Sequence, residues 1–122
     1  MRLVRFAALP FVAACAFIAL PANAEVIRTR APQTHVDAFL NGCKAKSVPT
    51  ATCTCMLEKL SATRDGDAAL DAMGLFHAVT DEQQRKAALL PLLNRHAMRP
   101  SELKAAIDPQ GPTLSTVLKQ CQ

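Results

Sequence analysis

The sequence predicts an all-α domain of five or six short helices, a small bundle held by two disulfide bonds. Apolar residues recur at i, i+3, i+4, i+7, the spacing of one helix face, and no segment alternates as a strand would. Capping and turn residues divide the chain into brief segments. An even number of cysteines after an export signal indicates a disulfide framework, here Cys43, Cys53, Cys55 and Cys121.

The first 24 residues have the features of a secretory signal peptide. Two arginines lie within residues 1–5, and residues 6–20 carry no charge. This apolar run is shorter than the roughly 20 residues that span a bilayer as a helix. Small side chains at Ala22 and Ala24 predict cleavage after Ala24. The expected organisation is a signal peptide at 1–24, a flexible lead-in at 25–33 and a single helical domain at 34–122.

An alternative within this leader is a lipoprotein signal. Residues 12–15 resemble a lipobox, in which Cys15 would be acylated and would anchor the protein to a membrane. The apolar run before Cys15 is short, however, and residues 16–20 stay apolar where a lipoprotein usually turns polar. We therefore favour the secretory signal, with which Cys15 is lost, and expect a periplasmic or secreted protein without stable membrane insertion.

The composition of the mature chain argues against a nucleic-acid partner. Removal of the two leader arginines lowers the formal net charge from +4 to about +2. Phe39 and Phe76 are the only aromatic residues after residue 24. Nucleic-acid binding typically needs a basic stripe with stacking aromatic side chains. We expect no nucleic-acid partner.

Two helices are predicted in the first half of the mature chain. Thr34, with Asp37 three residues later, resembles a capping pattern and opens a helix that ends near Lys46. Its apolar face consists of Val36, Phe39, Leu40 and Cys43. Pro49 fits the first turn of a second helix, which extends to about Thr63. Its apolar stripe consists of Cys53, Met56, Leu57 and Leu60.

Residues 64–67 are expected to interrupt the helical pattern, with Asp67 capping a third helix. Gly74 weakens the prediction of that helix. Residues 80–83 match a second capping box and open a fourth helix, in which Pro91 is expected to cause a kink or break. Two shorter helices follow, one from Pro100 to near Ile107 and one over residues 113–121, separated by turn residues.

Helix geometry favours one of three disulfide pairings. Cys53 and Cys55 point to opposite sides of their helix, because two residues turn it by roughly 200°. Cys43 and Cys53 lie about one turn on either side of the loop at residue 48, so they face each other, which leaves Cys55 for Cys121. The swapped pairing and a bond between Cys53 and Cys55 remain alternatives.

Several residues could carry chemistry. The C-x-C at Cys53 and Cys55 could cycle as a thiol-redox pair. With Met56 and a histidine (His35, His77 or His96), it could form a soft copper(I) site. We expect His35 and His96 at helix edges and His77 half-buried. Three acidic residues are interpreted as a solvated helix cap rather than a calcium site: Asp65, Asp67 and Asp71. No nucleophile with a partner and no phosphate loop is recognisable, so we expect no enzyme and no cofactor.

One segment has a wider resemblance. Phe39 and Leu40, then Cys43, a loop with Pro49, and Cys53-x-Cys55 followed by Leu57 and Leu60 form a C…C-x-C pattern over about 30 residues. This pattern resembles uncharacterised small helical proteins exported by Gram-negative bacteria. The resemblance implies a periplasmic helical fold and no activity.

These observations predict a non-enzymatic periplasmic binding or accessory protein, such as an inhibitor, an immunity-type protein or a secretion accessory. The partner is expected to be another protein. The alternative function is thiol redox or copper handling through Cys53 and Cys55.

Overall fold

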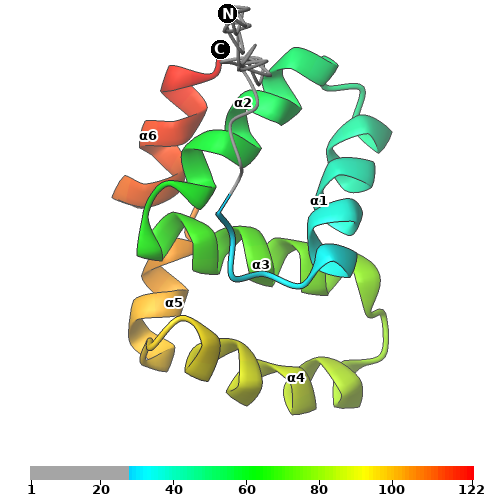
Figure 1. Cartoon of the computed structure of the whole chain (residues 1–122), viewed down its shortest axis with the longest axis vertical. Coiled ribbons are helices and arrows are strands. Elements are labelled where there is room, and N and C mark those ends of the chain that lie inside the picture. The colour runs from blue at the N-terminus through cyan, green and yellow to red at the C-terminus, as the bar shows by residue number, and fades with distance from the viewer. Residues whose placement is uncertain (1–27) are drawn as a thin grey trace, which may run out of the picture.

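The computed structural model describes residues 28–122, and this part of the chain is all-α, as predicted (Figure 1). It forms six helices and no strand: α1 (Gln33–Ala45), α2 (Thr50–Ser61), α3 (Arg64–Ala78), α4 (Glu82–Arg95), α5 (Pro100–Ala106) and α6 (Pro112–Gln120). Within the described residues, no helix is long and apolar enough to cross a bilayer. The predicted signal peptide, including Cys15 and the cleavage residues Ala22 and Ala24, lies outside them.

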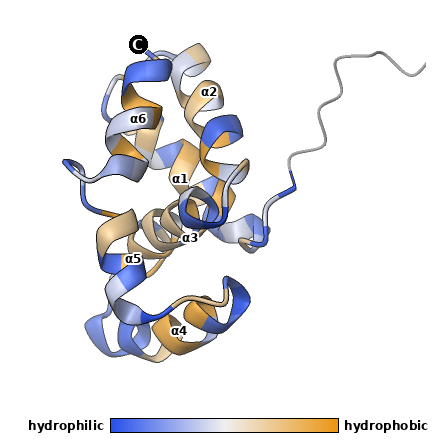
Figure 2. Ribbon diagram, turned by 90° about the vertical axis from the view of Figure 1, so that its left-hand side faces the viewer, coloured by the Kyte–Doolittle hydropathy of each residue, from blue (hydrophilic) through white to orange (hydrophobic). Residues whose placement is uncertain are grey.

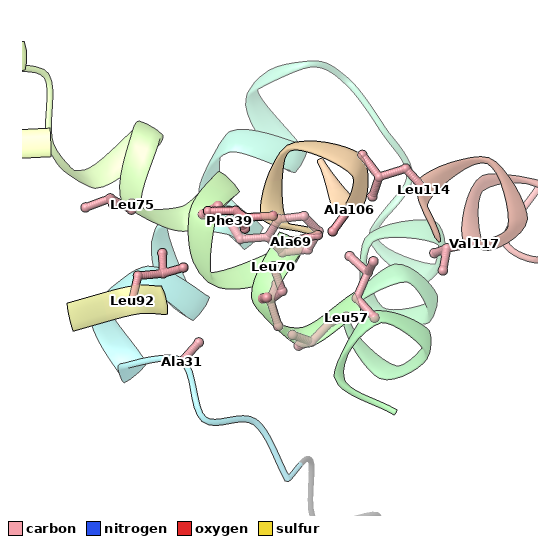
Figure 3. Close-up of a cluster of buried hydrophobic side chains, with 14 of the residues drawn as sticks. Ala31, Phe39, Leu57, Ala69, Leu70, Leu75, Leu92, Ala106, Leu114 and Val117 are labelled. Atoms are coloured by element: carbon pink, nitrogen blue, oxygen red, sulfur yellow. The ribbon is translucent and has the colours of Figure 1, made fainter. Parts of the chain in front are cut away.

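Helix α3 is the centre of the fold. It packs against each of the other five helices (Figure 1). Its residues 66–72 are all buried, and several are small, which lets neighbouring backbones approach closely. Side chains from the surrounding helices converge on this core, as the cluster around Ala69 and Leu70 in Figure 3 shows. A buried helix with small side chains therefore replaces the large apolar core that a longer chain could build.

Helix α1 crosses α3 closely at Gly74. A Cβ atom at Gly74 would lie 2.1 Å from the carbonyl oxygen of His35, so a side chain does not fit there. The sequence suggested that Gly74 weakens the helix. In the structure, α3 continues through Gly74 to Ala78, because packing against α1 outweighs the low helix propensity of glycine.

The start of α3 differs from the prediction. Residues 64–67 do not interrupt the chain but form the first turn of the helix, and Asp67 is not its cap. The side chain of Thr63 is the N-cap and accepts a hydrogen bond from the Gly66 amide at 3.0 Å. Gly66 is needed in this turn because a Cβ there would lie 2.4 Å from the Leu60 carbonyl oxygen.

The predicted capping residues of two other helices are also shifted. Helix α1 begins at Gln33 after Pro32, so Thr34 lies inside the helix and does not cap it. Helix α4 is capped by Asp81 rather than Thr80, and its carboxylate accepts a hydrogen bond from the Gln84 amide at 3.0 Å. Both shifts are small; Thr80 and Asp81 are neighbouring residues that can each accept a capping bond, whereas α1 has no side-chain cap.

Helix α4 continues through Pro91 from Glu82 to Arg95, so Pro91 does not break the helix; a kink at this position stays a prediction. Pro91 and Ala87 are both exposed, which leaves the carbonyl that loses its helical hydrogen bond close to solvent. Leu92, which is fully buried, anchors the last turn to the core. Burial of this residue therefore holds the helix together beyond the proline.

The described part of the predicted lead-in packs on the helical domain. Residues 28–32 run across α3 in an extended path, and Ala31 is buried in the core (Figure 1). The Thr29 hydroxyl and the Arg30 amide both donate hydrogen bonds to the Asp67 carboxylate, the latter at 2.8 Å. This segment packs against α3 because the buried carboxylate of Asp67 accepts its hydrogen bonds.

Candidate functional site

The two disulfide bonds join the ends of three helices. Cys43 of α1 is bonded to Cys53 of α2, with Cα atoms 6.0 Å apart. Cys55 of α2 is bonded to Cys121 at the end of α6, with a Cα separation of 5.6 Å. This is the pairing that helix geometry favoured. The two cysteines of the C-x-C thus bind α2 to a different neighbour on each side.

This pairing changes the environment of the proposed redox or copper site. Both cysteines of the C-x-C are oxidised, and Cys53 is completely buried. A thiolate ligand or nucleophile would first require reduction of a disulfide. Of the suggested copper ligands, only Met56 and His77 line one hollow, together with Met73. His77 is exposed rather than half-buried. His35 and His96 lie away from this hollow, and the rings of both contact Asp71 of α3.

A cluster of buried carboxylates lies at the centre of the molecule. Asp67 and Asp71, one turn apart on α3, are 5% and 0% exposed. Both oxygens of Asp71 are bonded: His35 Nδ1 lies at 2.5 Å, His96 Nε2 at 2.8 Å, and the Arg95 guanidinium donates from 3.0 to 3.2 Å. Asp71 therefore connects α3 to the start of α1 and the end of α4, and its charge is balanced by Arg95.

The interpretation of the acidic residues as a solvated cap is therefore wrong for Asp67 and Asp71. His35 and His96 do lie near helix ends, but His96 is 1% exposed and both rings contact Asp71. These partners are 36 and 25 residues away in the sequence, so no local spacing reveals them. One signal was available: Asp71 interrupts an otherwise apolar run over residues 68–75, where a charge requires a buried partner.

His96 has one satisfied and one unsatisfied nitrogen. Its Nε2 atom faces the Asp71 carboxylate, which only accepts hydrogen bonds, so this nitrogen carries a proton. Its Nδ1 atom is buried and has no hydrogen-bond partner in the structure. The nearest carboxylate oxygen, Oδ2 of Asp67, is 3.7 Å from Nδ1, which is beyond hydrogen-bond distance. Such an orphaned atom is uncommon in a folded protein.

No family model, protein of known function or solved structure matches this chain.

Next to His96 is a hollow of about 310 Å³ that we call the arginine pocket. Its walls come from the segment before α1, the corner between α2 and α3, and the end of α4. It is lined by Arg28, Arg30, Arg64, Asp67 and His96, with small residues from the two turns between them. Three arginines and one aspartate are among these residues, and Arg64 is also paired with Asp65 at 3.3 Å.

Two of these arginines also hold the end of α4. Arg30 donates to the Arg95 carbonyl at 3.2 Å and Arg64 to the Ala97 carbonyl at 3.3 Å, and cations are favourable at a helix C-terminus. Arg64 also pairs with Glu102 at 3.0 Å. A hydrogen bond from Arg99, with a smaller contribution from the charge of Arg64, lowers the pKa of Glu102.

A second surface feature is an apolar groove of about 440 Å³ between α3, α4 and α5. Figure 2 shows the hydrophobic residues of α4 on this part of the molecule. Leu90 is 65% exposed and Phe76 37% exposed, although both are large and apolar. The apolar lining consists of Phe76, Leu89, Leu90, Leu93, Leu103 and Ile107. Pro100 and two exposed lysines, Lys86 and Lys104, complete the groove.

The described residues also show what the site lacks. No three His, Cys, Asp or Glu side chains in residues 28–122 are placed to hold a metal ion together. The carboxylate cluster has the charges of an acid–base site, but Asp71 and His96 are enclosed and turned toward one another. The hydrogen bonds of the carboxylate cluster connect α1, α3 and α4. The arginine pocket and the apolar groove, in contrast, are open at the surface.

Proposed function

We propose that this protein is a non-enzymatic, exported binding or accessory protein that binds another protein through the apolar groove. The observation that carries this proposal is the exposure of Leu90 and Phe76 in one groove with four further apolar residues. Single exposed apolar side chains are ordinary, but a contiguous apolar surface with a polar rim is typical of a protein-binding site. The two disulfides suit an oxidising compartment outside the cytoplasm.

The chemistry of the groove indicates the form of the partner. It lies between three helices, and an amphipathic helix fits such a groove with residues spaced i, i+3, i+4, i+7. Lys86 and Lys104 are part of its lining, so acidic residues beside the partner's apolar stripe would be complementary. An inhibitor, an immunity-type protein or a secretion accessory would each use such a surface, and the specific role depends on the partner.

Site-specific photocrosslinking tests the proposal. A photoreactive amino acid is placed at Leu90 in the groove or, as the matched control, at Gln83, which is exposed on the same helix outside the groove lining. Both variants are expressed in the native exporting host, irradiated in intact cells, and their adducts are identified by mass spectrometry. We expect position 90 to give a discrete heterologous protein adduct that is absent at position 83.

A second variant links the adduct to the apolar surface. Lys86 carries the photoreactive group, and Phe76→Glu places a charge on the opposite side of the groove. We expect the adduct yield to fall about tenfold or more, because a charge in an apolar interface is costly. Equal adducts at positions 90 and 83, adducts only between copies of this chain, or no adduct at all would show that the groove is not the binding site.

A further inference from the structure

We propose that Met56, Met73 and His77 form a site for a single copper(I) ion in the hollow between α1, α2 and α3. These two thioether side chains and one imidazole line the same hollow, which has a volume of about 310 Å³. The inference is independent of the proposed function, because this hollow shares no lining residue with the apolar groove. It also differs from the copper site that the sequence suggested, since neither cysteine of the C-x-C is a ligand.

The donor set of the hollow suits a soft monovalent cation. Thioether and imidazole ligands are uncharged, and soft sulfur ligands select copper(I). The lining has no aspartate or glutamate, the side chains that magnesium, calcium and manganese prefer. All four cysteines of the described chain are in disulfides, so no thiolate competes. A thioether binds a metal without losing a proton and cannot form a disulfide, so it remains a ligand in an oxidising compartment.

The two methionines reach the hollow from different helices. Met56 lies on α2 and Met73 on α3, and both are partly buried at the edge of the core. Their flexible, unbranched side chains can turn a polarizable sulfur toward a ligand. Met98, the third methionine of residues 28–122, is 7% exposed and lies in the core outside the hollow. The soft sulfur ligands of the described chain are therefore concentrated in this one hollow.

His77 is the histidine that is available to a ligand. The rings of His35 and His96 both contact the buried Asp71. Within residues 28–122, the ion pairs of histidine involve these two residues and not His77, whose side chain is exposed. His77 follows Met73 by one helical turn, and residues spaced i, i+4 lie on the same face of a helix. Helix α3 thus presents a sulfur and an imidazole to the hollow together.

The imidazole is positioned by the backbone of α1. A Cβ atom at Gly42 would lie 2.7 to 2.9 Å from three atoms of the His77 ring, so the ring packs on the bare backbone at this glycine. The next residue, Cys43, lines the hollow and is bonded to Cys53, which lies about one turn before Met56. The disulfide therefore fixes the helix of Met56 against the helix on which the His77 ring rests. Such preorganisation lowers the cost of ordering the ligands when a metal binds.

The charges around the hollow allow a single positive charge and disfavour two. Lys46 also lines the hollow, but it is exposed and its ammonium group can extend into water. The last turns of α1 and α3, at Cys43 and His77, bring the partial negative charge of two helix C-termini. The start of α2, at Thr52, brings the opposite sign. Because no anionic side chain lines the hollow, a divalent ion would be repelled more than copper(I).

Transfer of copper(I) from a coloured chelator measures binding. The exported, oxidised protein is titrated into the copper(I)–bicinchoninate complex in the absence of oxygen, and the colour falls as the metal is removed. We expect transfer of one equivalent, competition by silver(I), no displacement by zinc, and no cysteine that becomes available for alkylation. Absence of 1:1 transfer, displacement by zinc, or release of thiols would overturn the proposal.

Leucine variants separate ligation from packing. Met56→Leu and Met73→Leu keep most of the apolar volume but lose the sulfur, and His77→Gln removes the imidazole at an exposed position. Each should weaken copper(I) binding about tenfold or more, because even loss of a partner of a metal ligand costs about 10–100-fold in affinity. Met98→Leu is the matched control and should bind as the wild type does. Wild-type affinity in any of the three ligand variants, or an equal loss in Met98→Leu, would contradict the assignment.

The wild-type protein supplies a readout that does not depend on variants folding. Methyl ¹H–¹³C spectra observe the ε-methyl group beside each methionine sulfur, and silver(I) serves as a diamagnetic probe that is stable to oxidation. Silver(I) should shift the methyl signals of Met56 and Met73 and the ring signals of His77. The signals of Met98 and His96, which lie outside the hollow, should not change. Binding without these shifts would place the ion elsewhere and refute the proposed site.

Discussion

Asp71 has an unusual position for a charged residue. Its side chain is completely buried in the central helix and is contacted by His35, Arg95 and His96, which come from two other helices and the turn after α4. Burial of an unpaired carboxylate would be very unfavourable, so its presence depends on these three partners. Arg95 is 32% exposed, which keeps one end of the network in contact with water.

Asp71→Asn tests this network. The amide has the same shape, but it loses the ion pair with Arg95 and cannot accept all the present hydrogen bonds. We expect the free energy of unfolding, measured by urea titration and circular dichroism, to fall by about 3 kcal/mol. Asp37→Asn is the control, since Asp37 is exposed and should change stability by no more than about 0.5 kcal/mol. Equal stability of the two variants would contradict a structural role of the buried charge.

At the scale of elements, the crossing of α1 over α3 depends on one missing side chain. The His35 carbonyl occupies the space that a Cβ at Gly74 would need. The backbone contact also positions His35 itself, whose ring then reaches Asp71 on the same face of α3. Helix crossing and charge pairing therefore support each other at this point.

Gly74→Ala should destabilise the protein, although alanine has the higher helix propensity. Propensity alone predicts a gain of about 1 kcal/mol, whereas separation of two packed backbones costs about 1–3 kcal/mol or more. In the control Gly42→Ala, the three atoms nearest to the new Cβ all belong to the ring of the exposed His77, which can move. Thermal unfolding should show a lower Tm for the first variant alone. A Tm for Gly74→Ala at or above that of the wild type would disprove the tight crossing.

Helix α6 is the element that depends most on a disulfide. Only Leu114 and Val117 of its nine residues are buried, while Leu118 is 39% exposed. Each buried side chain contributes roughly 1.5–3 kcal/mol, but ordering the backbone costs about 1–2 kcal/mol per residue. Apolar burial alone therefore does not secure this helix, and the bond from Cys121 to Cys55 supplies the remaining restraint.

Cys121→Ser should release α6 and expose one thiol. The lost bond spans 66 residues, for which loop closure accounts for up to about 4 kcal/mol. We expect a lower Tm, faster proteolysis after residue 112, and one reactive thiol in place of none, which peptide mapping should assign to Cys55. The double variant Cys43→Ser/Cys53→Ser is the comparison, because its loop of 10 residues accounts for about 3 kcal/mol. An unchanged Tm and an intact C-terminus in Cys121→Ser would rule out this account.

At the scale of the whole molecule, the described chain is organised around α3, with the other five helices packed on it. The segment before α1 is part of this unit through Thr29, Arg30 and Ala31. A start of the mature chain shortly before these residues would leave all of these contacts intact.

We predict that the exported protein begins at Glu25, because residues 22–24 match the small-x-small pattern that signal peptidase cleaves. The intact mass of the exported form measures this directly. Ala24→Arg is the control, since a large charged residue at the cleavage site should cause the uncleaved precursor to accumulate. A lipidated species that begins at Cys15 would instead show that the alternative signal is used.

Much of the fold could be predicted from local pattern. The spacing of apolar residues predicts where helices form. The direction in which side chains point around a helix predicts which cysteines pair. Cys53 and Cys55, two residues apart, reach different neighbours for that reason alone. Exact boundaries were less predictable, because Thr63 and Asp67 both have side chains that cap helices and only packing decides between them.

The candidate sites could not be predicted in this way. The arginine pocket joins Arg28, Arg64 and His96 from three separate parts of the chain. Leu90 follows the apolar pattern of α4 as well as the buried Leu92 does, yet the two differ completely in exposure. No periodicity distinguishes a residue that faces the core from one left without a partner helix.

The sequence by itself determined the helices, their order and the favoured disulfide pairing, because these depend on contacts within a few residues or on the direction of side chains around one helix. Only the tertiary structure decided which polar residues are buried, that Asp71 binds partners 25 and 36 residues away, and that His96 retains an unsatisfied nitrogen. Burial and pairing of charges depend on which helices pack together. That arrangement is a property of the whole chain rather than of any segment.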